Sequence, residues 1–308
     1  MLFLKYIITG IFLLSVSFSN LKAQNEVKHL DIPNVNSSLT ESYFILTKNE
    51  DTLYFVRAQK FTSKAKKTIY TSVKQNGSWS KPIPISFNLE NFSDDSPFLT
   101  LDGKTMFFTS NRPGSIEGSK DVWKSTRVKG KWSKPINLGG NVNSPSSEFG
   151  VSVAQNGNLY FGSSRKESKG MGDIYFSKLT KGKYDKAVNL GENINTKTGE
   201  WGSVVAPDES FIIFESHGRE SNVSFAGDLY ISYRRDGKWQ QAKNMLKFNS
   251  IGSDLAPRMN SFLNILYFSS NRNDEPKYGD NTNVYYVDLS EILKNKIFKL
   301  QTQKNNDE

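Results

Sequence analysis

The chain has 308 residues, with 40 lysines and arginines against 31 acidic residues and a net charge of +9 at pH 7. It holds no cysteine and two histidines, His29 and His217. Disulfide bonds, a cysteine nucleophile, a lipid on an N-terminal cysteine and a zinc site of cysteine and histidine are therefore excluded. The cations are spread along the chain and do not form one basic stripe, so we do not expect nucleic acid as a partner.

Residues 1–23 read as a secretion signal. Lys5 precedes an apolar run over residues 7–16, and small or polar residues then lead to Ala23. This run is shorter than the roughly 20 residues that span a bilayer, so we predict cleavage after Ala23 in preference to an uncleaved anchor. The mature chain is expected to be periplasmic or secreted, monomeric and not membrane-spanning.

A unit of about 50 residues is repeated five times between residues 40 and 290. Each copy opens on an acidic residue before an apolar strand, and the last four of these residues are spaced 53, 52 and 54 positions apart. They are Asp95 in DSPFLTL, Glu148 in EFGVSVA, Glu200 in EWGSVVA and Asp254 in DLAPRMN, after an earlier copy that starts at Glu41 or Ser42. A repeat of this length built from short strands predicts one propeller blade per copy.

The copy that begins at Asp95 shows the strands most clearly. Apolar or alternating segments over residues 97–101, 105–109, 121–125 and 132–138 predict four strands. Asp102-Gly103 and Lys129-Gly130 mark tight turns, and a long polar loop covers residues 110–120. We therefore predict an all-β fold, a five-bladed β-propeller over residues 24–290 with four-stranded antiparallel blades. Six blades are the alternative count.

The two ends of the repeat region predict how the ring closes. The fifth copy lacks a fourth strand, while residues 27–30 form an unassigned apolar piece before the first copy. We expect this N-terminal segment to supply the outer strand of the last blade, because closure removes an exposed sheet edge. Residues 291–308 are predicted to form a short helix and a polar tail.

Strand order assigns the loops to two faces. The tight turns share one face, and the long loops share the other with the linkers between blades, so the long-loop face is where we expect binding residues. The acids that open the innermost strands should ring the channel mouth on that face, near arginines that follow the second strands. This candidate ring consists of Asp95, Glu148, Glu200, Asp254, Arg112, Arg165, Arg219 and Arg272.

Two interpretations of the ring stay open. Charged groups that recur in every blade can clamp the loops of every blade, because arginine pairs well with carboxylates and carbonyls. Alternatively, the ring binds a cation, a basic peptide or a sugar. Calcium would suit clustered oxygen ligands, although the chain has no D-x-D-x-D-G loop, so no metal and no cofactor is assigned.

Most catalytic chemistry finds no support in the sequence. No serine sits in a G-x-S-x-G elbow, and no Walker A or G-x-G-x-x-G stretch follows a strand and opens a helix. His217, in the long loop 217–227, is interpreted as an ordinary loop residue. Paired carboxylates remain, and these are the groups that glycoside hydrolysis uses.

The segment SPFLTLDGKTMFFTSNR, followed by DVWKS, resembles the TolB-type, WD-like propeller repeat of exported Bacteroidetes-type bacterial proteins. The resemblance covers about residues 40–288 and implies a binding or scaffold module of the cell envelope. Its partner would be a protein, peptide or glycan on the long-loop face. A glycosidase that uses the channel-mouth carboxylates is the alternative, and a purely structural role is a third.

Overall fold

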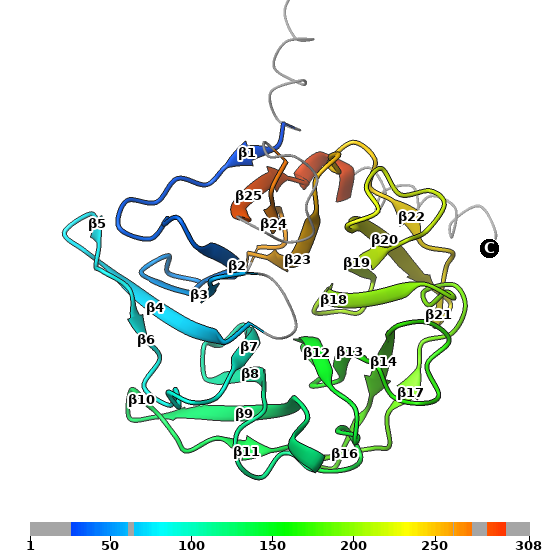
Figure 1. The fold of residues 1–308 in the computed structure, drawn as a ribbon, viewed down its shortest axis with the longest axis horizontal. Coiled ribbons are helices and arrows are strands. Elements are labelled where there is room, and N and C mark those ends of the chain that lie inside the picture. Colours follow the sequence, from blue (N-terminus) through cyan, green and yellow to red (C-terminus); the bar gives the residue numbers. More distant parts are fainter. Residues whose placement is uncertain (1–25, 61–64, 261, 273–281, 294–308) are drawn as a thin grey trace, which may run out of the picture.

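The computed structural model describes residues 26–60, 65–260, 262–272 and 282–293. The predicted signal peptide, the polar tail and the predicted helix beyond residue 293 lie outside the described residues. Five antiparallel sheets stand around a central axis, and the chain visits them in order, as the colours in Figure 1 show. The prediction of a five-bladed β-propeller is confirmed.

Each blade is one repeat of the sequence, and β2, β7, β12, β18 and β23 are the innermost strands (Figure 1). Blade 1 contains β2 (Thr40–Leu46), β3 (Thr52–Ala58), β4 (Lys67–Gln75), β5 (Ser78–Trp79) and β6 (Ile83–Pro84). Blade 2 contains β7 (Asp94–Leu99), β8 (Thr105–Ser110), η1 (Ile116–Gly118), β9 (Asp121–Val128), β10 (Lys131–Trp132) and β11 (Ile136–Asn137). Blade 3 contains β12 (Glu148–Val153), β13 (Leu159–Ser163), β14 (Asp173–Ser177), β15 (Leu179–Thr180), β16 (Lys183–Tyr184) and β17 (Val188–Asn189). Blade 4 contains β18 (Gly199–Val205), β19 (Phe211–His217), β20 (Asp228–Arg235), β21 (Lys238–Trp239) and β22 (Lys243–Asn244). Blade 5 contains β23 (Asp254–Met259), β24 (Ile265–Ser270), β25 (Asn283–Asp288) and β1 (Lys28–His29).

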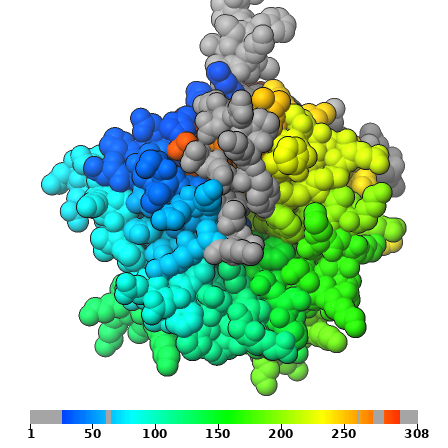
Figure 2. All heavy atoms as spheres, viewed as in Figure 1, coloured from blue at the N-terminus to red at the C-terminus, as the bar shows by residue number. Residues whose placement is uncertain are grey.

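The N-terminal strand closes the ring as predicted. Strand β1 pairs with β25, with Lys28 opposite Tyr286 and His29 opposite Tyr285. In the space-filling view of Figure 2, a few orange C-terminal atoms are visible beside the blue N-terminal sector. Blade 5 therefore draws on both ends of the propeller, as the strand pairing shows. The segment after β1 also contributes Ile32 and Val35 to the core between blades 1 and 5.

The predicted fourth strand is wrong in one respect, because it is broken into two short pieces. In blade 2 the Ser125 hydroxyl donates to the Ser133 carbonyl (2.7 Å), and the Ser133 hydroxyl accepts from the backbone of Thr126 (3.1 Å). These side-chain bonds replace ladder bonds between β10 and β11, and the nearby Pro135 has no N–H to restore the ladder. Edge strands tolerate such breaks because their outer side faces solvent.

Apolar side chains fill the seams between blades. One core cluster joins Phe211 and Ile213 of blade 4 to Phe268 and Val287 of blade 5. The helical turn 290–293, which follows β25, adds Leu293 to this cluster. In the part of the chain that the structure describes, no helix has both the length and the apolar character needed to span a membrane.

The innermost strands share a bulge halfway along. Register shifts interrupt the pairing of every innermost strand with its neighbour, for example between Asp95 and Phe98. The backbone is left-handed at Tyr43, Ser96, Gly150 and Ala256. A bulge bends the strand and redirects nearby side chains. Here it separates the axis of the propeller into a long-loop half and a tight-turn half.

Candidate functional site

The acidic residues that open the innermost strands are buried within their own blades. Each carboxylate is at most 3% exposed and pairs with an arginine of the same blade. The pairs are Glu41–Arg57 (2.8 Å), Asp94–Arg112 (2.7 Å), Glu148–Arg165 (3.1 Å), Glu200–Arg219 (2.9 Å) and Asp254–Arg272 (2.7 Å). We call these five ion pairs the blade clamps.

Each clamp arginine also holds the linker that enters its blade. Arg165 donates to the Val142 carbonyl (2.7 Å), and Arg272 donates to the Phe248 carbonyl (2.8 Å). The Arg165 guanidinium lies 4.4 Å from the ring centroid of Tyr175, so a cation–π contact fixes its plane. The geometry agrees with the clamping interpretation of the ring, and ligand binding by these residues stays a prediction.

One residue of the predicted ring occupies a different place. Strand pairing puts Asp94 opposite Ser110, as Glu148 is opposite Ser163 and Asp254 is opposite Ser270. Asp94 is therefore the clamp acid of blade 2, and Asp95 is the next residue along the strand. Two adjacent aspartates fit the repeat spacing about equally well, so spacing alone could not separate them. Because side chains alternate along a strand, Asp95 belongs to the opposite face from Asp94.

A second repeated network holds the long loops. The carboxylate of Asp173 accepts hydrogen bonds from the backbone N–H groups of Lys169 and Gly170 and from the Asn189 side chain. Asp121 and Asp228 play the same part in blades 2 and 4. These aspartates thus shape the loops and are fully occupied by them.

The chemistry at the axis comes instead from positions at which the blades differ. The residue after the clamp acid is Ser42, Asp95, Phe149, Trp201 or Leu255, depending on the blade. Several of these side chains meet groups from neighbouring strands on the long-loop half of the axis. We call the set the axial cluster: Tyr43, Lys67, Asp95, Lys120, Phe149, Trp201, Glu215 and His217.

Two lysines converge on one carboxylate of the cluster. The ammonium groups of Lys67 and Lys120 lie 2.9 and 3.4 Å from Oδ2 of Asp95, and the Ser96 backbone N–H donates to its Oδ1 (2.7 Å). Burial alone would raise the pKa of Asp95, but the two ammonium groups outweigh burial and hold that pKa at about 2. Burial lowers the pKa of Lys120, and the negative charge of Asp95 acts in the opposite direction without cancelling this effect. Two ammonium groups against one carboxylate give this part of the axis a net positive charge.

Aromatic rings and a second carboxylate complete the cluster. The rings of Phe149 and Trp201 meet edge to face with centroids 6.1 Å apart, and Trp201 lies 4.1 Å from the imidazole of His217. Nε2 of His217 is 3.9 Å from the Glu215 carboxylate, whose other oxygen accepts the backbone N–H of Ala256 (2.5 Å). Phe149 and Trp201 stay partly exposed, so aromatic surface borders hydrogen-bonding groups here.

Arg258 closes the axis below the cluster. Arg258 is 2% exposed, and its guanidinium donates to the carbonyls of Pro97, Val151, Ser203 and Pro257, which belong to four different blades. It also lies 4.6 Å from the ring centroid of Tyr43, which belongs to blade 1, the one blade that supplies no carbonyl. Burial lowers the pKa of Arg258 to about 10 and raises that of Tyr43 well above its usual value. The guanidinium stays charged at neutral pH and joins all five blades.

Sequence reasoning missed most of the axial cluster. It treated His217 as an ordinary loop residue, whereas His217 ends β19 and is 4% exposed. A usable signal was the contrast between copies: Glu215 stands where the other second strands have Val56, Thr109, Gly162 and Ser269. Among the described residues, no group of three or more histidine or acidic side chains is placed to hold a metal ion, and calcium binding stays untested.

The fold and the buried clamps define the chain as a five-bladed β-propeller. No protein-family model matches the sequence, and no curated protein matches it. The fold is similar to that of a protein assigned as TolB from Agrobacterium tumefaciens, with 14% identity and a TM-score of 0.52 over 78% of this chain and 73% of that one.

Two proteins assigned as glycoside hydrolases are similar to a comparable degree. The one from Bacteroides ovatus has 9% identity and a TM-score of 0.50 over 81% of this chain and 87% of that one. The one from Parabacteroides distasonis has 9% identity and a TM-score of 0.50 over 86% and 93%. At these identities the likeness extends to the propeller fold alone.

Proposed function

We propose that the chain is an exported binding or scaffold module of the cell envelope, with its ligand site at the axial cluster on the long-loop face. The ligand is a protein segment, a peptide or a glycan. The observation that carries this proposal is the gathering of unlike side chains from several blades at one end of the axis. The acidic residues and arginines that recur in every blade, by contrast, already pair with each other in the blade clamps.

The chemistry of the cluster suits recognition. Trp201 and Phe149 supply apolar faces with few rotatable bonds, while the partly exposed Lys120 supplies a polar group beside them. Binding sites commonly combine aromatic walls with a few well-placed polar groups. The lysines that neutralise Asp95 favour a ligand that brings acidic or hydrogen-bond-accepting groups to the axis.

A test compares two aromatic variants on an array of peptidoglycan fragments, envelope polysaccharides and envelope-protein peptides. Trp201→Ala should lose at least tenfold in affinity for any ligand that the wild-type protein binds, as expected for an aromatic anchor. Phe262→Ala, which alters a 65% exposed aromatic residue at the opposite, tight-turn face, is the control. Equal affinity of wild type and Trp201→Ala for the ligand would show that the axial cluster is not the ligand site.

Glycoside hydrolysis is the second candidate, because Asp95 and Glu215 both belong to the axial cluster. Such an enzyme needs one protonated and one ionised carboxyl group beside the sugar. Burial raises the pKa of Glu148 to about 7, but this carboxylate is committed to Arg165, Ser144 and Ser163 within its own blade. Turnover of aryl glycosides that disappears in Glu215→Gln and Asp95→Asn would favour the enzyme over the binding module.

A further inference from the structure

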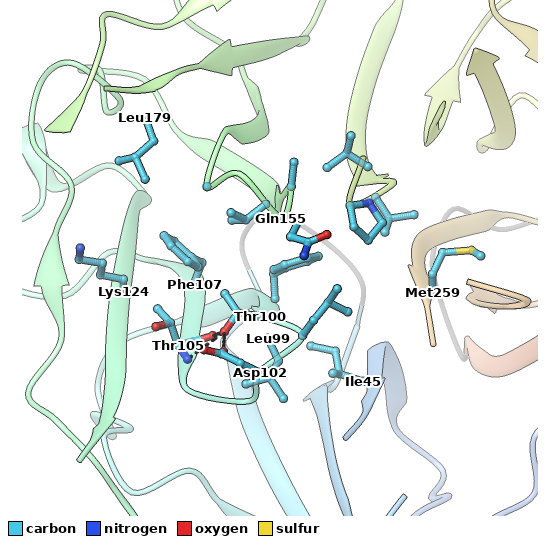
Figure 3. A pocket seen from close by; sticks show the side chains of 18 of the residues that line it. Ile45, Leu99, Thr100, Asp102, Thr105, Phe107, Lys124, Gln155, Leu179 and Met259 are labelled. Atoms are coloured by element: carbon cyan, nitrogen blue, oxygen red, sulfur yellow. Dashed lines mark hydrogen bonds between the residues drawn. The ribbon is translucent and has the colours of Figure 1, made fainter. Parts of the chain in front are cut away.

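A cavity of about 540 Å³ opens on the tight-turn face, at the other end of the axis from the axial cluster. Residues of all five blades line it, with Ile45 from blade 1 and hairpin residues from the other four, and Arg258 lies at its base. Figure 3 shows Phe107 and Lys124 on one side of this cavity and Ile45 and Met259 on the other. Its volume is within the range of small-molecule sites.

Most of the cavity wall is apolar. Phe98 and Phe107 of blade 2, Val153 and Leu179 of blade 3, and Met259 of blade 5 contribute carbon surface. The Arg258 guanidinium at the base offers no donor to a ligand, since its N–H groups are bonded to backbone carbonyls.

The polar turn residues at the rim are engaged with their own hairpins. Asp102 accepts from the Thr100 hydroxyl (2.6 Å) and from the Lys104 backbone (3.0 Å), and Asn260 bonds Asn264 and Ile265. A sugar ring would leave many of its hydroxyl groups without partners in such a cavity, which is costly.

One polar patch interrupts the apolar wall, on strands β8 and β9. Thr105 lies opposite Thr126, and Lys124 lies opposite Phe107, so these four side chains share one face of the sheet. All four line the cavity. Lys124 forms no ion pair with any described residue, so a cation and two hydroxyl groups stand together beside the aromatic wall.

The neighbouring outer hairpins add to the positive field. Residues 127–132 and 178–184 contain six cationic side chains and no carboxylate. The five lysines among them are exposed and form no ion pair within the described part of the chain. Such a field attracts anions to the cavity mouth.

We propose that this cavity binds a small anionic amphiphile, a carboxylate carried on a hydrocarbon body. The carboxylate pairs with Lys124 and accepts hydrogen bonds from Thr105 and Thr126, while the hydrocarbon lies along Phe98, Val153 and Leu179. The site is separate from the axial cluster, because Arg258 lies between them, so it does not depend on the function proposed for the long-loop face.

The test is calorimetric titration of the full chain with decanoate, with 1-decanol and acetate as the neutral and the short anionic probe. We expect decanoate to bind at least tenfold more tightly than decanol, and acetate not to bind, because both the charge and the hydrocarbon contribute. Lys124→Met should weaken decanoate about tenfold and leave decanol unchanged. Lys197→Met, at an exposed lysine in the linker between blades 3 and 4, should match wild type.

A second variant tests the apolar wall. Leu179→Glu places a like charge and a polar group against the hydrocarbon, and should abolish decanoate binding while the melting temperature of the protein is retained. Absence of decanoate binding by the wild type would overturn the proposal. Equal affinity for decanoate and decanol, or an unchanged affinity in Lys124→Met, would also overturn it.

Discussion

Replacing Arg258 by methionine tests whether one side chain holds the five blades together at the axis. Methionine keeps most of the volume, so the change removes charge and N–H groups without opening a large cavity. It leaves the carbonyls of Pro97, Val151 and Ser203 without their present donor. It also leaves Tyr43 without its cationic neighbour.

The expected loss of unfolding free energy is about 4 kcal/mol. A buried acceptor that loses its donor costs about 1–3 kcal/mol, and the removal of one member of a buried charge network costs about 3–5 kcal/mol. In a chain of this size the corresponding fall in melting temperature is about 10 °C. Arg258→Lys should recover only part of the loss, because an ammonium group cannot reach carbonyls on four blades at once.

Denaturant unfolding followed by tryptophan fluorescence and circular dichroism measures the effect. Arg235→Met is the matched control, because Arg235 is exposed on an outer hairpin, and its change should stay within about 0.5 kcal/mol. A loss below about 1 kcal/mol in Arg258→Met would refute the view that this residue joins the blades.

Three further predictions concern the closing strand, the axial carboxylate and the packing of the axis. Removing residues 26–36 takes away β1 together with the buried Ile32 and Val35, and should lower the unfolding free energy by about 3 kcal/mol, as measured by denaturant unfolding. It should also promote self-association through the exposed edge of β25, as measured by light scattering. Asp95 has a lowered pKa in the folded protein, so its stabilising contribution is present above about pH 4 and is lost as the pH falls toward 2. The difference in unfolding free energy between wild type and Asp95→Asn should therefore shrink by about 1 kcal/mol between pH 5 and pH 3. A difference that stays constant over this range would contradict the prediction. Gly150→Ala should destabilise by more than about 2 kcal/mol, because the new Cβ would lie 2.4 Å from the Gly202 backbone at a left-handed position, and unchanged unfolding would rule out this contact.

The architecture was predictable because every blade repeats the same pattern of strand and turn residues. Turns such as Asp102-Gly103 and strands such as 105–109 recur in each copy, so an ambiguous strand or turn in one copy can be assigned by comparison with the other copies. The closing strand was predictable from what the fifth copy lacks. The break in the fourth strand was not predictable, because it depends on hydroxyl groups such as that of Ser125. Their hydrogen bonds to the neighbouring strand do not change the alternation of apolar and polar residues in the sequence.

The candidate site was harder to predict, for a physical reason. Repeated groups such as Glu148 and Arg165 attract notice in a sequence, yet repetition is what a fold with five equal blades requires. The ligand site that we propose at the axis consists of unlike groups, and each of these occurs in a single copy, such as Glu215 and Trp201 in blade 4. A search for positions where the copies disagree is therefore the better guide to the site.

The central claim is that repeated charges hold the fold while unlike axial residues bind the ligand. A paired measurement of stability and binding in Arg165→Met and Lys120→Met tests it most directly, with unfolding free energy and array affinity recorded for both. We expect Arg165→Met to lose about 3–5 kcal/mol of stability and to keep its ligand while folded. Lys120→Met should stay folded and lose binding. The opposite assignment, with binding lost in a stable Arg165→Met and retained in Lys120→Met, would contradict the account.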